Sequence, residues 1–241
     1  DSTRKQTYLN STMDFALQRA ITEGLSEEES WDKGLIKIYE CLANDFHYNN
    51  PESLLSFPDN HDMDRIFTQL NEDVPKTKMA LAIHCFVPRI LQLYYGTEIL
   101  MQNSDKPGDH GLIRSDFPGG WPGDTVSAFN GLNLNDQQGE FQEFTRKLLN
   151  LRKDEFVMTN GRFLHKAPED GMYICGRKSS SALMLLLLNK SSQMQELNLM
   201  SIEEMLPKEY LYITDLIQNG AAQIAGHINV GPNSLKILKF H

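Results

Sequence analysis

Apolar and polar positions divide the chain into two parts with different periods. In the first part, strand-length apolar runs alternate with stretches in which apolar positions recur at helical spacing. We predict strands at 12–15, 54–57 and 90–95, a helical turn at 18–23, and longer helices at about 26–44, 76–86 and 135–153. Asn135 or Asp136 is expected to cap the last helix. Polar clusters follow the strands, and this alternation is typical of a parallel α/β sheet or barrel.

The first of the longer helices has an acidic beginning. Ser26 precedes the triplet Glu27–Glu29, and carboxylates stabilise the exposed N–H groups at a helix N-terminus. From Trp31 onward the apolar positions fall on one helical face. We therefore expect this helix to begin at Ser26 and to end near Asn44.

After Asp154 the pattern changes to short strand-like runs separated by glycine and proline. These runs are expected at 161–165, 172–177, 182–189, 194–199, 210–215, 227–230 and 234–240. Strands that recur every 8–12 residues or so are typical of a β-sandwich. The continuous apolar run 182–188 favours a buried strand. We therefore predict two domains, an α/β domain at 1–153 and an all-β sandwich at 154–241.

The α/β domain contains only about three strand–helix units, whereas a closed (β/α)8 barrel takes about 250 residues. Residues 1–153 therefore form either a small open sheet or part of a barrel. Part of a barrel exposes strand edges, and unpaired edges invite pairing with another chain. We expect helices, the tail of the chain or another molecule to cover these edges. A homodimer through the open sheet edge is one predicted outcome.

Composition narrows the classes of partner. The chain has 241 residues and a net charge of −9, and 40% of its residues are hydrophobic. This acidic balance, without a basic stripe, argues against nucleic-acid binding and suits neutral ligands such as sugars. No run approaches the roughly 20 apolar residues of a membrane-spanning helix, so we expect no membrane segment. No signal peptide is recognisable, and the location of the protein stays open.

Thiol and metal chemistry have little support in the sequence. Cys41, Cys85 and Cys175 match neither a disulfide framework nor a metal motif, so we expect buried free thiols. Asp105 and Asp109 lie in a loop and could bind Ca²⁺, but Ca²⁺ takes about 6–8 oxygen ligands. We therefore predict no cofactor and no metal site in these residues.

Four segments together resemble a known family. The segment 57–62, Phe-Pro-Asp-Asn-His-Asp, resembles the F-x-x-N-H-D motif of the α-amylase family, glycoside hydrolase family 13. The segment 92–98, Gln-Leu-Tyr-Tyr-Gly-Thr-Glu, resembles that family's Q-I-Y-Y-G-x-E, although 89–92 departs from its G-I-P-Q. The loop 106–121 and the segment 13–15 resemble the neopullulanase and cyclomaltodextrinase branch. The first motif alone is typical of an Asx-rich turn, but four segments in the family's order make the resemblance specific.

The resemblance implies both a fold and a site. The fold is the C-terminal part of a (β/α)8 TIM barrel, about strands six to eight, followed by a small all-β sandwich. Asp62 matches the family's third carboxylate, which stabilises the oxocarbenium-like transition state. His61 matches the family's sugar-binding histidine, whose N–H donates to a hydroxyl. The family's nucleophilic Asp and acid/base Glu belong to the fourth and fifth strands, which these residues do not match.

Two arginines near the motifs are expected to have structural roles. We expect Arg65 to form an ion pair, for which the candidate partners are Asp64, Asp62 and Asp116. Arg114 and Asp116 are expected to lock the long loop that contains them.

Three further residues have alternative roles. Asn60 is expected to shape the turn of the motif rather than to contact substrate. Glu98 follows a strand and a glycine, and it either locks the loop or contacts substrate. Trp121 either stacks on a sugar ring or packs within its loop.

The function implied by the resemblance is that of the C-terminal portion of a retaining α-glucan glycoside hydrolase acting on starch or maltooligosaccharides. A retaining glycosidase needs two carboxyl groups about 5–5.5 Å apart, and neither is matched here. We therefore expect these residues alone not to cleave glycosides. The alternative is a non-catalytic carbohydrate-binding or assembly module. An unrelated α/β enzyme is disfavoured, because no phosphate loop or nucleophile elbow is present.

Overall fold

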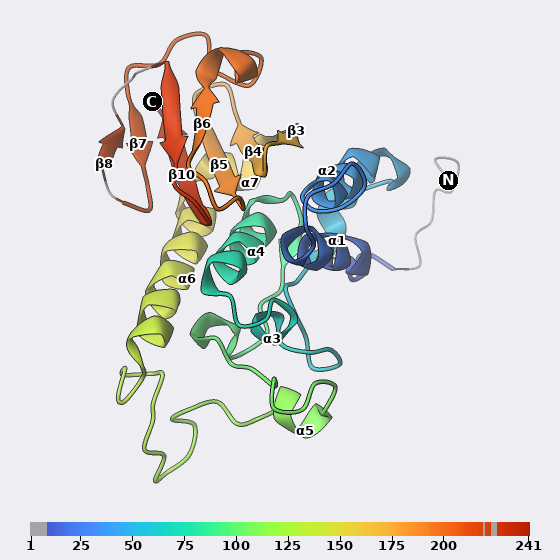
Figure 1. Cartoon of the computed structure of the whole chain (residues 1–241), viewed down its shortest axis with the longest axis vertical. Helices are drawn as coiled ribbons and strands as arrows, with labels where there is room; N and C mark the ends of the chain where they lie inside the picture. The colour runs from blue at the N-terminus through green and yellow to red at the C-terminus, as the bar shows by residue number, and fades with distance from the viewer. Residues whose placement is uncertain (1–8, 219, 223–225) are drawn as a thin grey trace.

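The computed structural model describes residues 9–218, 220–222 and 226–241. Figure 1 shows helices grouped around α4 in the first part of the chain and a sheet formed by the last part. The α-helices are α1 Phe15–Ser26, α2 Ile36–Ala43, α3 Ile66–Gln69, α4 Val74–Phe86, α5 His110–Ile113, α6 Asp136–Asp154 and α7 Phe156–Asn160. Short 3₁₀ helices are η1 Asn44–His47, η2 Pro51–Ser53, η3 Thr97–Ile99 and η4 Leu199–Ile202. No helix of the described residues is long and apolar enough to cross a membrane.

A short parallel ladder forms the sheet of the α/β part. β1 (Leu55–Ser56) pairs in parallel with β2 (Ile90–Leu91), and Met13 forms a parallel bridge to β1. β1 and β2 confirm the strands predicted at 54–57 and 90–95, although β2 ends well before the predicted Tyr95. The strand predicted at 12–15 is wrong, because only Met13 forms a bridge there and Phe15 already begins α1. Pro58 would supply the next N–H to this ladder and has none to donate, so the pairing stops after β2.

The helix predicted to begin at Ser26 is wrong at its start, because Ser26 ends α1 and α2 begins only after a loop. α1 contains the predicted turn at 18–23 and begins at Asp14, whose carboxylate accepts an N–H of the first turn at 3.0 Å. The acidic triplet lies in the α1–α2 loop. There Glu29 Oε1 accepts the Leu35 N–H at 3.2 Å. The carboxylate thus stabilises the start of α2 from outside the helix.

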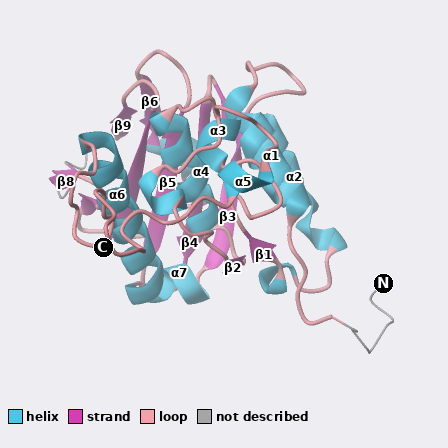
Figure 2. Ribbon diagram, turned by 90° about the horizontal axis from the view of Figure 1, so that it is seen from below, coloured by secondary structure: helices cyan, strands magenta, loops and turns pink. Residues whose placement is uncertain are grey.

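Two long helices agree with the predicted ranges and form the frame of the α/β part. α4 lies at the centre of the hydrophobic core, with α6 on one side and α1 and α2 on the other (Figure 2). α6 begins with a capping box. Asn135 Oδ1 accepts the Gln138 N–H at 2.8 Å, and the Gln138 side chain accepts the Asn135 N–H at 3.3 Å. Asn135 is therefore the cap, as one of the two alternatives predicted.

The last part of the chain is antiparallel throughout. A six-stranded sheet has the order β3–β4–β5–β10–β7–β8, and β6 pairs with β9 in a second layer. The strands are β3 Arg162–Glu169, β4 Met172–Lys178, β5 Leu183–Asn189, β6 Gln195–Asn198, β7 Ile213–Asp215, β8 Gly220–Ala222, β9 His227–Val230 and β10 Ser234–Phe240. Each of the seven predicted runs overlaps one of these strands, β3 extends four residues beyond its predicted run, and β8 was not predicted.

β5 is the strand that joins the two halves of the core, because every residue in it is buried. Leu183, Leu185 and Leu187 pack in the cluster that includes the β6–β9 layer. Met184 and Leu186 point the other way, into the cluster that contains α4. The apolar run therefore belongs to a strand buried on both faces. Because one core cluster crosses the helices and the sheet, the domain boundary near Asp154 stays a prediction.

A buried histidine links α4 to β1. His84 Nδ1 lies 2.7 Å from the Ser56 hydroxyl, both side chains are buried, and Nε2 has no partner among the described residues. Burial lowers the pKa of His84 to about 3. The folded chain therefore binds fewer protons here than the unfolded chain between about pH 3 and the ordinary histidine value near 6.5.

We predict that His84 contributes acid lability. Stability should fall as the pH drops from about 6.5 toward 3, with about 1.4 kcal/mol for each unit of pKa difference. His84→Asn keeps an acceptor for Ser56 and should flatten this part of the pH profile in urea unfolding. His47→Asn, which replaces an exposed imidazole, is the matched control and should keep the slope. Equal slopes for all three chains would show that His84 does not couple protons to folding.

Candidate active site

The turn after β1 is held by two buried polar residues. The carboxylate of Asp59 accepts the Ile66 N–H at 2.8 Å and the Thr97 hydroxyl at 2.7 Å. Burial raises the pKa of Asp59 to about 6. Asn60 is also buried, and its Oδ1 accepts the Asp62 N–H at 2.8 Å, which is the turn-shaping contact expected of it. These buried side chains therefore fix the backbone of the 57–62 motif.

His61 and Asp62 project from this turn into solvent, with 61% and 64% of their side chains exposed. The Asp62 carboxylate lies between two nitrogen groups. Arg114 donates to Asp62 Oδ1 at 2.9 Å, and His61 Nε2 lies 3.2 Å from Oδ2. Arg114 also donates to the His61 carbonyl at 3.0 Å. Two such neighbours fix the orientation of the exposed carboxylate and balance its negative charge.

Arg114 reaches Asp62 because α5 places it there. Asp109 caps α5 by accepting the Gly111 and Leu112 N–H groups at 2.9 and 3.1 Å. Arg114 follows directly after the helix, so it ties the long loop to the turn after β1, a more specific contact than the loop locking expected. Asp116, expected to share this role, forms no ion pair within the described ranges.

Arg65 departs from its predicted role. Within the described part of the chain no ion pair joins it to Asp64, Asp62 or Asp116. Arg65 is fully buried, and its guanidinium donates to the Ile113 carbonyl at 2.9 Å and to the Tyr95 carbonyl at 2.5 Å. Two carbonyl oxygens thus accept from the guanidinium in place of a carboxylate, and its Nη2 has no hydrogen-bond partner among the described residues.

The same guanidinium lies against two tyrosine rings. The Arg65 Cζ atom is 4.1 Å from the centroid of the Tyr94 ring and 5.0 Å from that of Tyr95. The Tyr94 ring in turn lies 6.4 Å, centroid to centroid, from the His61 ring. Burial raises the pKa of Tyr94 to about 12. We call Asn60, His61, Asp62, Tyr94 and Arg114 the active-site wall.

Glu98 and Trp121 lie outside these contacts. Glu98 is in the first turn of η3, where burial raises the pKa of its carboxyl, and the backbone amides beside it and Arg65 lower the pKa in part. Its Oε2 is buried and has no hydrogen-bond partner among the described residues, so its role stays a prediction. Trp121 lies on the α5–α6 loop with 63% of its surface exposed, and its backbone N–H donates to Asp124 at 3.1 Å. The two alternatives for its indole stay predictions.

Neither metal nor thiol chemistry adds to this wall. Asp109 is engaged as a helix cap and pairs with Lys106 at 2.6 Å. Across residues 9–218, 220–222 and 226–241, no three His, Cys, Asp or Glu side chains converge as a metal site. Cys85 and Cys175 are buried free thiols, and Cys41 is partly buried.

Comparison with known proteins identifies the family. The family described as the alpha amylase catalytic domain matches residues 3–155, well over half of the chain. The chain belongs to the α-amylase family. The cyclo-malto-dextrinase C-terminal domain matches residues 163–239. The predicted fold class is thus confirmed: this α-amylase-family chain is the C-terminal part of the barrel followed by an all-β domain.

This α-amylase-family chain spans half or less of the length of the following relatives and solved structures, whereas they match most of its own length. It is 25% identical to Alpha-amylase 3 of Dictyoglomus thermophilum, over 96% of this chain and 47% of that protein. It is 25% identical to a cyclomaltodextrin glucanotransferase of Paenibacillus macerans, over 75% of this chain and 22% of that protein. The α-amylase of Geobacillus thermoleovorans complexed with acarbose gives a TM-score of 0.73 at 21% identity, over 97% of this chain and 48% of that structure. A variant of AmyP in complex with maltotriose gives a TM-score of 0.78 at 19% identity, over 97% of this chain and 50% of that structure.

Sequence reasoning missed two members of the active-site wall. Arg114 was assigned to its own loop, although an exposed motif carboxylate needs a cationic neighbour and Arg114 follows a capped helix. Tyr94 was not assigned to the site, although it follows β2 by three residues, near the point where the ends of the parallel strands β1 and β2 meet. For both residues, the pairing of β1 with β2 is needed to know that the side chain lies at the site.

We predict that Arg65 is required for the geometry of this site. Arg65→Lys keeps the charge but removes the paired donations to two carbonyls, so unfolding free energy should fall by roughly 3 kcal/mol, with loss of tyrosine near-UV circular dichroism. Arg114→Lys, on the half-exposed arginine, is the matched control and should change stability by about 1 kcal/mol or less. Equal losses for both variants would contradict the buried role of Arg65.

Proposed function

We propose that this chain is the C-terminal portion of a retaining α-glucan glycoside hydrolase that degrades starch or maltooligosaccharides. In this proposal Asp62 stabilises the transition state and His61 binds a sugar hydroxyl. The observation that carries the proposal is the exposed Asp62 carboxylate, oriented by Arg114 and His61 beyond the carboxyl ends of parallel strands. Active sites of (β/α)8 enzymes are built at this end of the barrel.

The chemistry of the wall fits a positively charged transition state. Glycoside cleavage passes through an oxocarbenium-like species, and a carboxylate fixed before the reaction stabilises the developing charge without reorganising. The contacts of Arg114 and His61 hold Asp62 in one orientation. The His61 ring N–H can also donate to a sugar hydroxyl, while the Tyr94 ring supports the imidazole from behind.

The proposal assigns bond cleavage to carboxyl groups outside these 241 residues. Retaining cleavage needs a nucleophile and an acid/base group about 5–5.5 Å apart. The family segments that bear these groups have no match in the sequence. The 241 residues alone are therefore expected to bind glucans without cleaving them. Pairing of two copies through the open edge of the β1–β2 ladder stays a prediction.

The alternative is a non-catalytic carbohydrate-binding or assembly module. The ligands in the solved structures support sugars as the ligand class, since one is complexed with acarbose and another with maltotriose. The exposed Tyr212 of the β-sandwich stacks on His241 and does not form an open platform, which disfavours this alternative.

We predict that maltoheptaose binds at the active-site wall and is not hydrolysed. Isothermal titration should show millimolar or tighter binding, weakened about tenfold in Asp62→Asn, because one charge-assisted contact is worth about 1.4 kcal/mol or more. Asp105→Asn removes an exposed carboxylate of the neighbouring loop and is the matched control, for which affinity should not change.

Two results would count against this proposal. Release of reducing ends by the purified chain, abolished in Asp62→Asn, would show that cleavage needs no further carboxyl groups. Binding retained in full by residues 154–241 alone would support the alternative module instead.

A further inference from the structure

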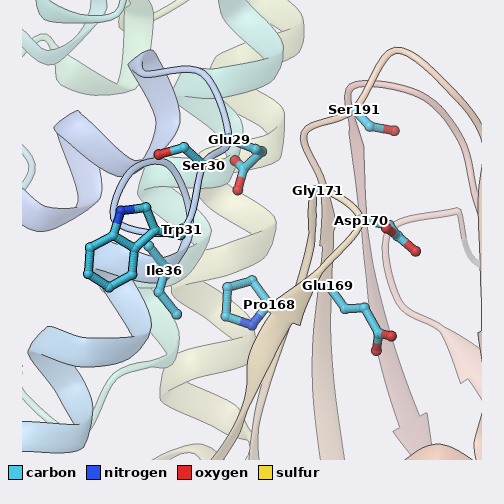
Figure 3. A pocket seen from close by; sticks show the side chains of 9 residues that line it. All are labelled: Glu29, Ser30, Trp31, Ile36, Pro168, Glu169, Asp170, Gly171 and Ser191. Carbon is cyan, nitrogen blue, oxygen red and sulfur yellow. The ribbon is translucent and has the colours of Figure 1, made fainter.

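A pocket of about 470 Å³ lies between the α1–α2 loop and the hairpin that joins β3 to β4. Trp31 and Ile36 line it on the helical side, and Pro168 lines it on the hairpin side (Figure 3). Small-molecule sites enclose about 300–1,000 Å³, so this Trp31 pocket has the size of a ligand site. No residue of the active-site wall lines it.

Trp31 has no structural role that explains its position. Its surface is 89% exposed, more than that of Trp121, and its indole stacks on no other ring in the described part of the chain. Each square ångström of apolar surface left in water forgoes about 25 cal/mol of burial free energy. A large, exposed aromatic side chain that lines a pocket is therefore a candidate contact for a ligand.

The loop that presents Trp31 is held rigidly by a residue from the sheet. Lys190 Nζ donates to the carbonyls of Gly24 and Glu27 at 2.8 and 2.6 Å, and pairs with Glu29 Oε1 at 2.5 Å. Only 8% of the Lys190 side chain is exposed. Glu29 also accepts the Leu35 N–H. A platform ordered in this way loses little conformational freedom on binding.

The opposite side of the pocket is equally pre-formed. Asp170 and Gly171 have φ values of 51° and 75°, as a two-residue hairpin turn requires. The Gly171 carbonyl accepts the Lys190 backbone N–H at 2.9 Å. A Cβ at Gly171 would lie 3.0 Å from that of Ser191, so the turn packs closely against the β5–β6 loop. Lys190 thus contacts both sides of the pocket and fixes their relative position.

The lining chemistry selects the class of ligand. No lysine, arginine or histidine lines the pocket, so anions such as phosphates are disfavoured. Trp31, Ile36 and Pro168 offer apolar surface, and Glu29 Oε2 keeps acceptor capacity. The Glu169 and Asp170 carboxylates point away from the Trp31 side in Figure 3. An apolar face beside a hydroxyl acceptor matches a neutral sugar ring.

We propose that the Trp31 pocket is a second, non-catalytic binding site for a neutral α-glucan chain, with the Trp31 indole as the stacking face and Glu29 as hydroxyl acceptor. The site itself is argued from the pocket, whereas the choice of an α-glucan among neutral sugars rests on the proposed function. Both sides of the pocket come from this chain, so the whole 241-residue chain is the right material for the test.

Indole fluorescence separates the two sites. The chain has two tryptophans, so Trp121→Phe leaves Trp31 as the single reporter. Maltoheptaose should change the emission of this variant saturably, and the same curve should appear when Asp62→Asn is added. In calorimetry, Trp31→Ala should lower affinity at this site about tenfold, the effect of losing one good aromatic contact. Phe46→Ala, which removes an exposed aromatic side chain that does not line the pocket, is the matched control and should leave the Trp31-dependent binding unchanged.

The outcomes distinguish this inference from the proposed function. No saturable change of Trp31 emission, or a change that disappears with Asp62→Asn, overturns the second site and leaves the active-site wall untouched. A response to tetramethylammonium chloride but not to maltoheptaose assigns a cation site and also overturns it. Binding that depends on Trp31 but not on Asp62 supports the second site and contradicts the proposed function.

Discussion

The buried guanidinium of Arg65 is the interaction on which the site depends. Its side chain donates to the Tyr95 carbonyl in the segment after β2 and to the Ile113 carbonyl at the end of α5, while Arg65 itself lies in the segment after the β1 turn. A fully buried cation without these partners would be strongly destabilising, so the three segments are held together. Because α5 is held, Arg114 reaches Asp62. Because the β2 end is held, the Tyr94 ring lies between Arg65 and His61.

The sheet part of the molecule supports this arrangement from the far side of the core. β5 is buried on both faces, so the helices around α4 and the β6–β9 layer share one strand as their common wall. Lys190, at the end of that strand, then fixes the α1–α2 loop. A residue of the sheet thus positions Trp31, a residue of the helical part. The pocket beside Trp31 is therefore lined by both halves of the molecule, whereas the active-site wall lies within the helical part.

Much of this structure is predictable from the sequence, and the failures have a physical pattern. Most strands of the sheet, and Asn135 as one of two candidate caps of α6, follow from local periodicity, and the pair His61–Asp62 follows from the motif. Local patterns failed where the partner is distant. Glu29 stabilises the start of a helix across a loop, and Arg65 donates to two backbone carbonyls whose inward orientation no side-chain pattern records. β2 ends early because Pro58, which follows β1, has no N–H to donate to the ladder. This effect can be recognised only once the pairing of the two strands is known.

The central claim is that the active-site wall is assembled in this chain and meets an α-glucan. Backbone amide chemical shifts of the ¹⁵N-labelled chain, followed during titration with maltoheptaose, test it most directly. The account predicts shifts that cluster at His61, Asp62, Tyr94 and Arg114, with a separate group around Trp31. Shifts that leave His61, Asp62 and Arg114 unmoved at saturating sugar, in a chain whose spectrum is that of a folded protein, would contradict it.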